Sequence, residues 1–432
     1  MLTKSDNRNN SCILLIDSGY FLIKEVKRAL QAQGCRAVTI PLNDVGESGY
    51  NPRLYSLFLN QIIDAYEAER PDFLLTINHL GFDQNGRLTE LLEALSLPGI
   101  VWYVDSPRYI LLNHLANVSD NIGIFLWEAA YESWLRQMGY KKIETLPLAT
   151  DPDTFCHLGG TYSAVTDHSS NPDSVVFVGD SMDFAVVKAF SKLPQHLMPD
   201  STNPDGALAA ELTTRFCQTA LSESFQRNNA PWEIYSEIAQ GMGYDIAECS
   251  PAADSQSDQL NDLNLESALV LMATRQQRHN FLRDLTGSDE IDTLQVYGDE
   301  GWKKILNGKT SVLPPVDYYR KLPNVYRDAG AVLNLTSMQM PTALNQRCYD
   351  VPAAGGFVIT DQQRSIQGQF ELEKEIVTFN STIEFKEKWR FYKKNPTARQ
   401  AVIDAGRERV LQEHTYSHRI AKMNSIVRNW FS

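Results

Sequence analysis

The sequence has too little positive charge for a protein whose main partner is nucleic acid. Its 40 Lys and Arg residues stand against 53 Asp and Glu residues, so the formal net charge is −13 over 432 residues. Most of such a surface repels a polyanion, which excludes nucleic acid as the main partner. A smaller phosphate-bearing ligand is still compatible, because arginines and backbone N–H groups can gather locally in a pocket.

Long apolar runs and cysteine motifs are also missing. The first apolar stretch, Cys12 to Ile16, is too short for a signal peptide or a membrane span, and no later stretch is long enough to be a transmembrane segment. The six cysteines form no C-x-x-C pair, which favours reduced thiols and a cytoplasmic protein. His414 and His418 have helical spacing but no H-E-x-x-H motif, and we expect no metal ion.

What the sequence does contain is a regular alternation of short apolar runs and amphipathic stretches. In the first part of the chain CILLI, RAVTI, FLLTI, IVWYV and GIFLW are typical of buried strands, and helix-like segments separate them. Such βαβ units form parallel sheets with right-handed crossovers. We predict a Rossmann-like lobe over residues 1–160.

A second lobe follows a stretch with linker composition between Gly159 and Ser174. Strand-like runs recur there as SVVFVGD, TLQVYGD, VLNLT, FVITD and EIVTF. Residues 184–285 interrupt them without a strand-like run of comparable strength, which predicts a helical insertion. The predicted fold class is therefore α/β, with two Rossmann-like lobes, the second over residues 174–416.

Candidates for proton transfer lie in the first lobe. Ligands of open parallel sheets bind outside the carboxyl ends of the strands, and His79 and Asp105 follow the runs FLLTI and IVWYV. Histidine exchanges a proton near neutral pH, which suits a general base. A structural role is the alternative for both, because Asp105 begins a good helix start, Asp-Ser-Pro, and His79 could be a core residue.

The richest segment of the second lobe is TALNQRCYDVPAAGGFVITD, from Thr342 to Asp361. A helix start here would direct free N–H groups at a diphosphate, with Arg347 one turn inside the helix. Asp350 could then accept hydrogen bonds from a ribose. The alternative is a surface ion pair between Arg347 and Asp350, three residues apart on a helix.

The same residues carry a resemblance to a known family. The stretch from Asn324 to Arg419 resembles the C-terminal lobe of the CgeB-like (spore maturation protein type) glycosyltransferases, of the GT-B class. The matching pieces are VYRDAGAVLNLT, the spacing N-x-R-x-x-D that ends at Asp350, AAGGFVITD, EIVTF and GRERVLQEHTYSHR. PDFLLTINHLGFDQNGRL, IVWYVDSP and LPLATDPDTF are similar to the N-terminal domain of that family.

The resemblance implies a GT-B fold, in which the two lobes face a central cleft and the C-terminal helix, residues 417–432, packs back on the first lobe. An apolar stripe in that helix is consistent with such packing. One departure concerns the pair of Glu residues that many retaining members carry seven residues apart. Asp350 occupies the second place and Thr342 the first, so the stereochemical course stays open.

The function implied is transfer of a sugar from a nucleoside diphosphate sugar, a UDP-sugar in the first place, to a glycan or protein acceptor. We expect no metal ion and no other cofactor. The catalytic candidates are His79 and Asp105, and the predicted donor-binding residues are Gly179, Tyr297, Gly298, Tyr318, Asn345, Gln346, Arg347 and Asp350. A nucleotide-sugar-binding protein without turnover and a nucleotide-sugar epimerase of the same fold are the alternatives.

Overall fold

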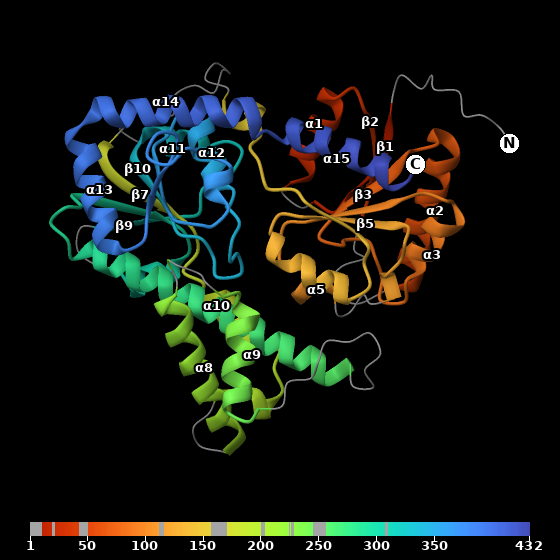
Figure 1. Ribbon diagram of the computed structural model, residues 1–432, viewed down its shortest axis with the longest axis horizontal. Coiled ribbons are helices and arrows are strands. Elements are labelled where there is room, and N and C mark those ends of the chain that lie inside the picture. The colour runs from red at the N-terminus through yellow and green to blue at the C-terminus, as the bar shows by residue number, and fades with distance from the viewer. Residues whose placement is uncertain are drawn as a thin grey trace. The chain divides into compact units, whose positions relative to one another are not determined.

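The computed structural model describes residues 11–19, 22–42, 51–111, 116–156, 171–199, 204–223, 225, 229–244, 256–306 and 310–432. The chain divides into two compact units (Figure 1). The first comprises Met1–Pro147 and Tyr416–Ser432, and the second comprises Leu148–Thr415. The division thus falls at Pro147, whereas the expected end of the first lobe, residue 160, lies outside the described residues. No helix among the described residues has the length and apolarity of a membrane span.

The first unit is built on a parallel six-stranded sheet in the order β2-β1-β3-β4-β5-β6. Its central strands β3, β4 and β5 are buried at every residue, as expected where helices cover both faces of a sheet. The strand order reverses between β1 and β3. The elements are β1 (Cys12–Asp17), α1 (Ile23–Ala32), β2 (Arg36–Pro41), α2 (Pro52–Glu69), β3 (Phe73–Ile77), α3 (Arg87–Ala94), β4 (Gly99–Tyr103), α4 (Arg108–Leu111), β5 (Ile122–Leu126), η2 (Ala129–Tyr131), α5 (Glu132–Gln137) and β6 (Lys142–Thr145).

The last helix of the chain, α15 (Tyr416–Trp430), belongs to this first unit, where it lies beside α1 (Figure 1). Its residues Ile420, Met423 and Val427 are buried. Trp430 reaches β5, and a Cβ atom added to Gly123 would come within 2.7 Å of its ring. A glycine at position 123 therefore leaves the room that the indole occupies.

The second unit is built on another parallel six-stranded sheet, in the order β12-β11-β10-β7-β8-β9. The strand order reverses between β7 and β10, so the carboxyl ends of these two strands mark the topological switch point. The elements are α6 (Pro152–Phe155), β7 (Asn171–Val178), β8 (Thr293–Tyr297), η4 (Glu300–Lys304), β9 (Thr310–Leu313), α11 (Leu322–Asp328), β10 (Ala329–Asn334), α12 (Arg347–Ala353), β11 (Val358–Asp361), η5 (Ile366–Gly368), β12 (Val377–Phe379), α13 (Thr382–Lys394) and α14 (Pro396–Glu413).

Helices fill the described part of the predicted insertion. They are α7 (Asp183–Phe190), η3 (Gln195–Leu197), α8 (Pro204–Ser222), α9 (Pro231–Gly241) and α10 (Gln256–Thr286). Figure 1 shows α8 and α9 against α10. They share a hydrophobic core that includes Phe216, Ile234 and Leu269. The C-terminal part of α10 instead packs into the core under the sheet through Phe281 and Leu285. The predicted fold class, including the insertion, is confirmed.

Candidate functional site

The loops after β7 and β8 hold each other in place. Trp302 Nε1 donates a hydrogen bond of 2.8 Å to the carbonyl oxygen of Gly179. Asp299 accepts hydrogen bonds from the backbone N–H and the hydroxyl of Ser181, at 2.8 and 2.7 Å. A Cβ atom at Gly298 would lie 2.4 Å from the Gly179 oxygen, so only glycine permits this approach. The backbone carbonyls that follow β7 are therefore fixed in direction.

Two arginines from different helices bind these carbonyls. Arg347, at the start of α12, donates from Nη2 to the oxygen of Val178 at 2.5 Å. Arg278, on α10, donates from Nη1 to the oxygen of Asp180 at 2.9 Å. The Nε atoms of both arginines are buried and have no hydrogen-bond partner among the described residues. Each guanidinium thus retains donor capacity at the switch point.

The electrostatics of this pair favour a nearby anion. Burial, with a smaller contribution from the charge of Arg347, lowers the pKa of Arg278 to about 10, against the opposing effect of Asp180, Asp361 and Asp299. Arg278 is still protonated at neutral pH. Two positive charges with a low-dielectric surrounding repel each other, and a doubly charged group placed between them would relieve that repulsion. A diphosphate has this charge and several acceptor oxygens.

The start of α12 differs from the prediction. The helix begins at Arg347 itself and not one turn earlier. The N-cap residue, Gln346, makes no side-chain cap, and instead Asn345 Oδ1, one residue earlier, accepts the backbone N–H of Arg347 at 3.1 Å. Asn345 also donates from Nδ2 to Asn334 Oδ1, at 2.7 Å, at the end of β10. Since Asn345 takes the first N–H of the helix, the positive charge at the site comes from the arginine side chains.

Three of the predicted donor-binding residues form a second, adjoining group. The hydroxyl of Tyr318 donates to Asp350 Oδ2 at 2.9 Å, and Thr150 Oγ1 donates to Oδ1 at 2.7 Å. Gln346 Nε2 lies 2.6 Å from the oxygen of Ala149, to which it donates. Asp350 is 1% exposed, so the alternative of a surface pair with Arg347 is wrong. Its carboxylate already accepts hydroxyl groups of the kind that a ribose carries.

His79 and Asp105 lie in the first unit, at the ends of β3 and β4. A hydrogen bond of 2.8 Å joins His79 Nδ1 and the hydroxyl of Tyr103. Asn78 Nδ2 donates to Asp105 Oδ2 at 2.7 Å. Asn78 and His79 both have positive φ, 53° and 64°, which is uncommon outside glycine and costs free energy. Asn78 therefore connects the two candidates, because it donates a hydrogen bond to Asp105 and directly precedes His79 in the chain.

The structure thus brings the predicted residues together in three groups. Gly179, Tyr297, Gly298, Asn345 and Arg347 surround the switch point of the second unit, where Gly179 N donates to the Tyr297 oxygen at 2.9 Å. Tyr318, Gln346 and Asp350 form the adjoining network. His79 and Asp105 belong to the first unit. Sequence reasoning missed Arg278, because a single arginine in a long helix carries no motif.

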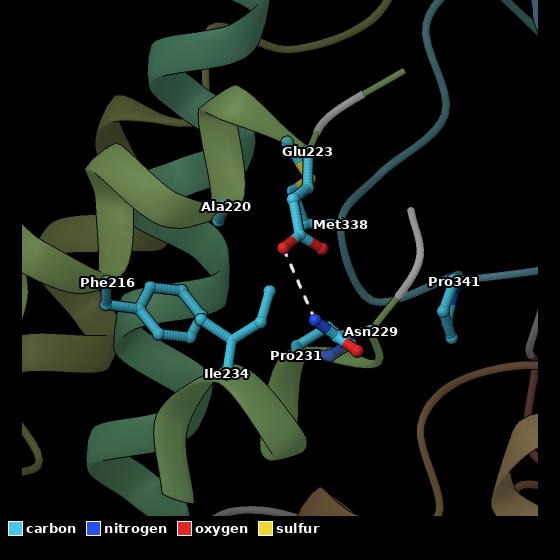
Figure 2. Close-up of a pocket in the computed structure, with 8 residues that line it drawn as sticks. All are labelled: Phe216, Ala220, Glu223, Asn229, Pro231, Ile234, Met338 and Pro341. Carbon is cyan, nitrogen blue, oxygen red and sulfur yellow. Dashed lines mark hydrogen bonds between the residues drawn. The ribbon is translucent and has the colours of Figure 1, made fainter. Parts of the chain in front are cut away.

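Among the described residues there is no cluster of three or more His, Cys, Asp or Glu side chains that could hold a metal ion. His414 Nε2 forms a hydrogen bond of 3.0 Å with the oxygen of Gln369. A small pocket lies between α8, α9 and the loop after β10. Asn229 Nδ2 donates a hydrogen bond of 3.3 Å to Glu223 Oε1 at this pocket. Figure 2 shows these two side chains at one side of the apolar residues Phe216 and Ile234. No predicted donor-binding residue lines it.

Comparisons with known proteins agree with the predicted function class. Residues 275–425 match a family model described as glycosyl transferase-like, which covers less than half of the chain and includes both arginines. No curated protein matches the sequence. The match confirms the glycosyltransferase character of this part of the chain.

Solved structures give the fold. A sucrose-phosphate synthase from Thermosynechococcus elongatus has a TM-score of 0.51 at 13% identity, over 98% of this chain and 99% of that one. A glycosyltransferase from Rickettsia africae has a TM-score of 0.51 at 10% identity, with 98% and 99% covered. At these identities the likeness shows the fold alone, and the predicted GT-B fold is confirmed.

Proposed function

We propose that this protein is a CgeB-like glycosyltransferase that moves a sugar from a nucleoside diphosphate sugar, in the first place a UDP-sugar, to a glycan or protein acceptor. The observation that carries the proposal is the pair Arg278 and Arg347 at the switch point of the second unit. Both hydrogen-bond to backbone carbonyls, and both keep a buried Nε donor without a partner among the described residues. A diphosphate satisfies both.

The arginine pair suits the chemistry of the reaction. The acceptor oxygen forms a bond to the anomeric carbon and loses its proton, while the bond from that carbon to the diphosphate oxygen breaks. Negative charge then builds on the departing nucleoside diphosphate. Fixed cationic donors in a water-poor site stabilise this charge without reorganisation, so no metal ion is required.

The remaining predicted residues take further roles in the proposed reaction. Asp350 is the proposed ribose ligand, since its Oδ2 already accepts a phenolic hydroxyl from Tyr318. Asn345 and Gln346 hold the start of α12 and with it Arg347. If the reaction inverts the anomeric configuration, His79 or Asp105 accepts the proton of the acceptor hydroxyl. A retaining reaction requires no such base.

Product analysis tests the proposal. The full chain is incubated with UDP-glucose, UDP-galactose, UDP-N-acetylglucosamine and GDP-mannose, and the products are separated by chromatography. We expect release of the nucleoside diphosphate, by transfer or by slow hydrolysis. Interconversion of UDP-glucose and UDP-galactose would instead identify an epimerase, and thermal stabilisation without any product would identify a binding protein. A ligand at a hundred times its Kd adds about 2.7 kcal/mol, so absence of stabilisation by all four would refute the donor site.

A further inference from the structure

Gln277, next to Arg278 on α10, is a buried amide whose polar atoms find no hydrogen-bond partner in the described part of the chain. The residue is 3% exposed, and neither Oε1 nor Nε2 has a hydrogen-bond partner among the described residues. A buried amide left in this state costs free energy, because water satisfied both atoms in the unfolded chain. An apolar side chain would make the free protein more stable at this position.

Neighbouring contacts place Gln277 at the carboxyl edge of the sheet. Thr274, one turn earlier on α10, accepts the backbone N–H of Met338 at 3.1 Å, in the loop after β10. Phe281, one turn later, packs on Phe379 of β12 at 5.2 Å between ring centroids. Because residues three and four apart share one face of a helix, Gln277 lies between these two contacts. It therefore lies on the stretch of α10 that meets the loop after β10 and the end of β12, one residue before Arg278.

A second buried amide lies at this edge. Gln363, just after β11, is 2% exposed, and its Nε2 donates to Asp361 Oδ2 at 2.8 Å. Its Oε1 has no partner among the described residues. Asp361 also accepts the hydroxyl of Thr336 at 2.8 Å, and its charge acts on Arg278. The amide of Gln363 is thus joined through Asp361 to the surroundings of the proposed diphosphate site.

We propose that Gln277 and Gln363 bind hydroxyl groups of the donor sugar. The inference rests on the proposed function, because a sugar linked to a diphosphate held by Arg278 would lie beside these amides. Gln277 offers one acceptor and one donor group, which suits a hydroxyl that donates and a neighbour that accepts. Gln363 offers a further acceptor. Because both amides are neutral, they suit a donor sugar whose groups at these positions are uncharged hydroxyls.

The test is the substitution Gln277→Met, which keeps the length of the side chain and removes its polar atoms. We expect the free protein to become more stable, with a Tm a few degrees higher, since a buried amide without partners is lost. The Kd for UDP-glucose should rise about tenfold, whereas the Kd for UDP should stay within about twofold. Gln277→Leu repeats the test if methionine packs poorly. Gln276→Met, on the same helix but partly exposed, is the matched control and should leave both Kd values unchanged.

The outcomes distinguish a failure of the proposed donor from a failure of the proposed contact between Gln277 and the sugar. If the wild-type protein binds neither UDP-glucose nor UDP, the proposed donor is wrong. If it binds both and Gln277→Met is more stable with unchanged Kd values, the amide holds only buried water and the inference is overturned. Equal losses for UDP and UDP-glucose would also overturn it, because the residue would then act on the nucleotide and not on the sugar. A selective loss for UDP-glucose, together with higher stability, supports it.

Discussion

Replacing Arg278 by methionine should separate stability from ligand binding in this protein. In the free protein the guanidinium is buried and makes one hydrogen bond, to the oxygen of Asp180, and no carboxylate bonded to it is found among the described residues. In the proposed complex it would meet a diphosphate. The same side chain is thus unfavourable in one state and favourable in the other, and methionine keeps most of its apolar bulk.

The magnitude follows from the pKa. A pKa lowered from 12.5 to about 10 corresponds to about 3 kcal/mol by which the folded surroundings, chiefly burial, disfavour the charged form. Because the folded protein holds this proton less tightly than the unfolded chain, the cost is present throughout the neutral range and declines only above about pH 10. The lost hydrogen bond offsets about 1 kcal/mol of the gain. Ligand-free Arg278→Met should therefore unfold with a free energy equal to the wild type or up to about 2 kcal/mol higher.

Binding should change in the opposite direction. A charge-assisted hydrogen bond to phosphate contributes about 2 kcal/mol, so the Kd for UDP should rise about thirtyfold. Urea denaturation gives the stability and calorimetry gives the affinity. Arg390→Met is the control, because it removes the same charge from a side chain of α13 that is 48% exposed and paired with Glu290; the affinity should not change, and the lost ion pair should cost at most about 1 kcal/mol of stability. A loss of 3 kcal/mol or more in stability with unchanged affinity for UDP would show that Arg278 only holds the loop after β7, and would refute the reasoning.

Three further predictions follow from named contacts. Turnover should persist in excess EDTA, because the leaving-group charge is assigned to Arg278 and Arg347; a complete loss that Mg²⁺ reverses would contradict this. Gly298→Ala should destabilise the second unit by about 2 kcal/mol in denaturation, since its Cβ would lie 2.4 Å from the Gly179 oxygen, whereas Gly368→Ala, with no atom within 4 Å of its Cβ, should be neutral. A chain that ends at Tyr416 should show faster amide exchange in β1 and α1, because α15 packs on α1. Faster exchange only after Leu148 would contradict that packing.

The sheets could be predicted because their central strands are short, apolar and separated by helical patterns. The run FLLTI becomes β3, in which all five residues are buried, and FVITD becomes β11. Strand β9 escaped prediction. Its four residues, Thr310–Leu313, lie at the edge of the sheet and are only half-buried or exposed, so they show neither an apolar run nor a clean alternation. Edge strands depend on a neighbour, here β8, which the local sequence does not specify.

The residues of the candidate site that come directly after a strand could be predicted from the sequence. Gly179 and Gly298 directly follow β7 and β8, and their close approach explains why glycine stands at position 298. The start of α12 could not be located, because the loop before it contains several polar residues and the actual N-cap, Gln346, makes no side-chain cap that would distinguish it. Nor could the loss of exposure at Asp350 be predicted, since Thr150, its partner, is 200 residues away in sequence.

Helix α10 explains why the insertion cannot be a separate addition to the fold. Its earlier turns contribute Leu265 and Leu269 to the core of the insertion, and its last turns contribute Phe281 and Leu285 to the core under the sheet. Both ends of the helix are therefore fixed by apolar packing. Between them lie Gln277 and Arg278, two buried polar side chains whose hydrogen-bonding groups are only partly satisfied by the described residues. Because a single rigid helix spans both cores, the insertion fixes the position and direction of these two side chains at the switch point of the sheet.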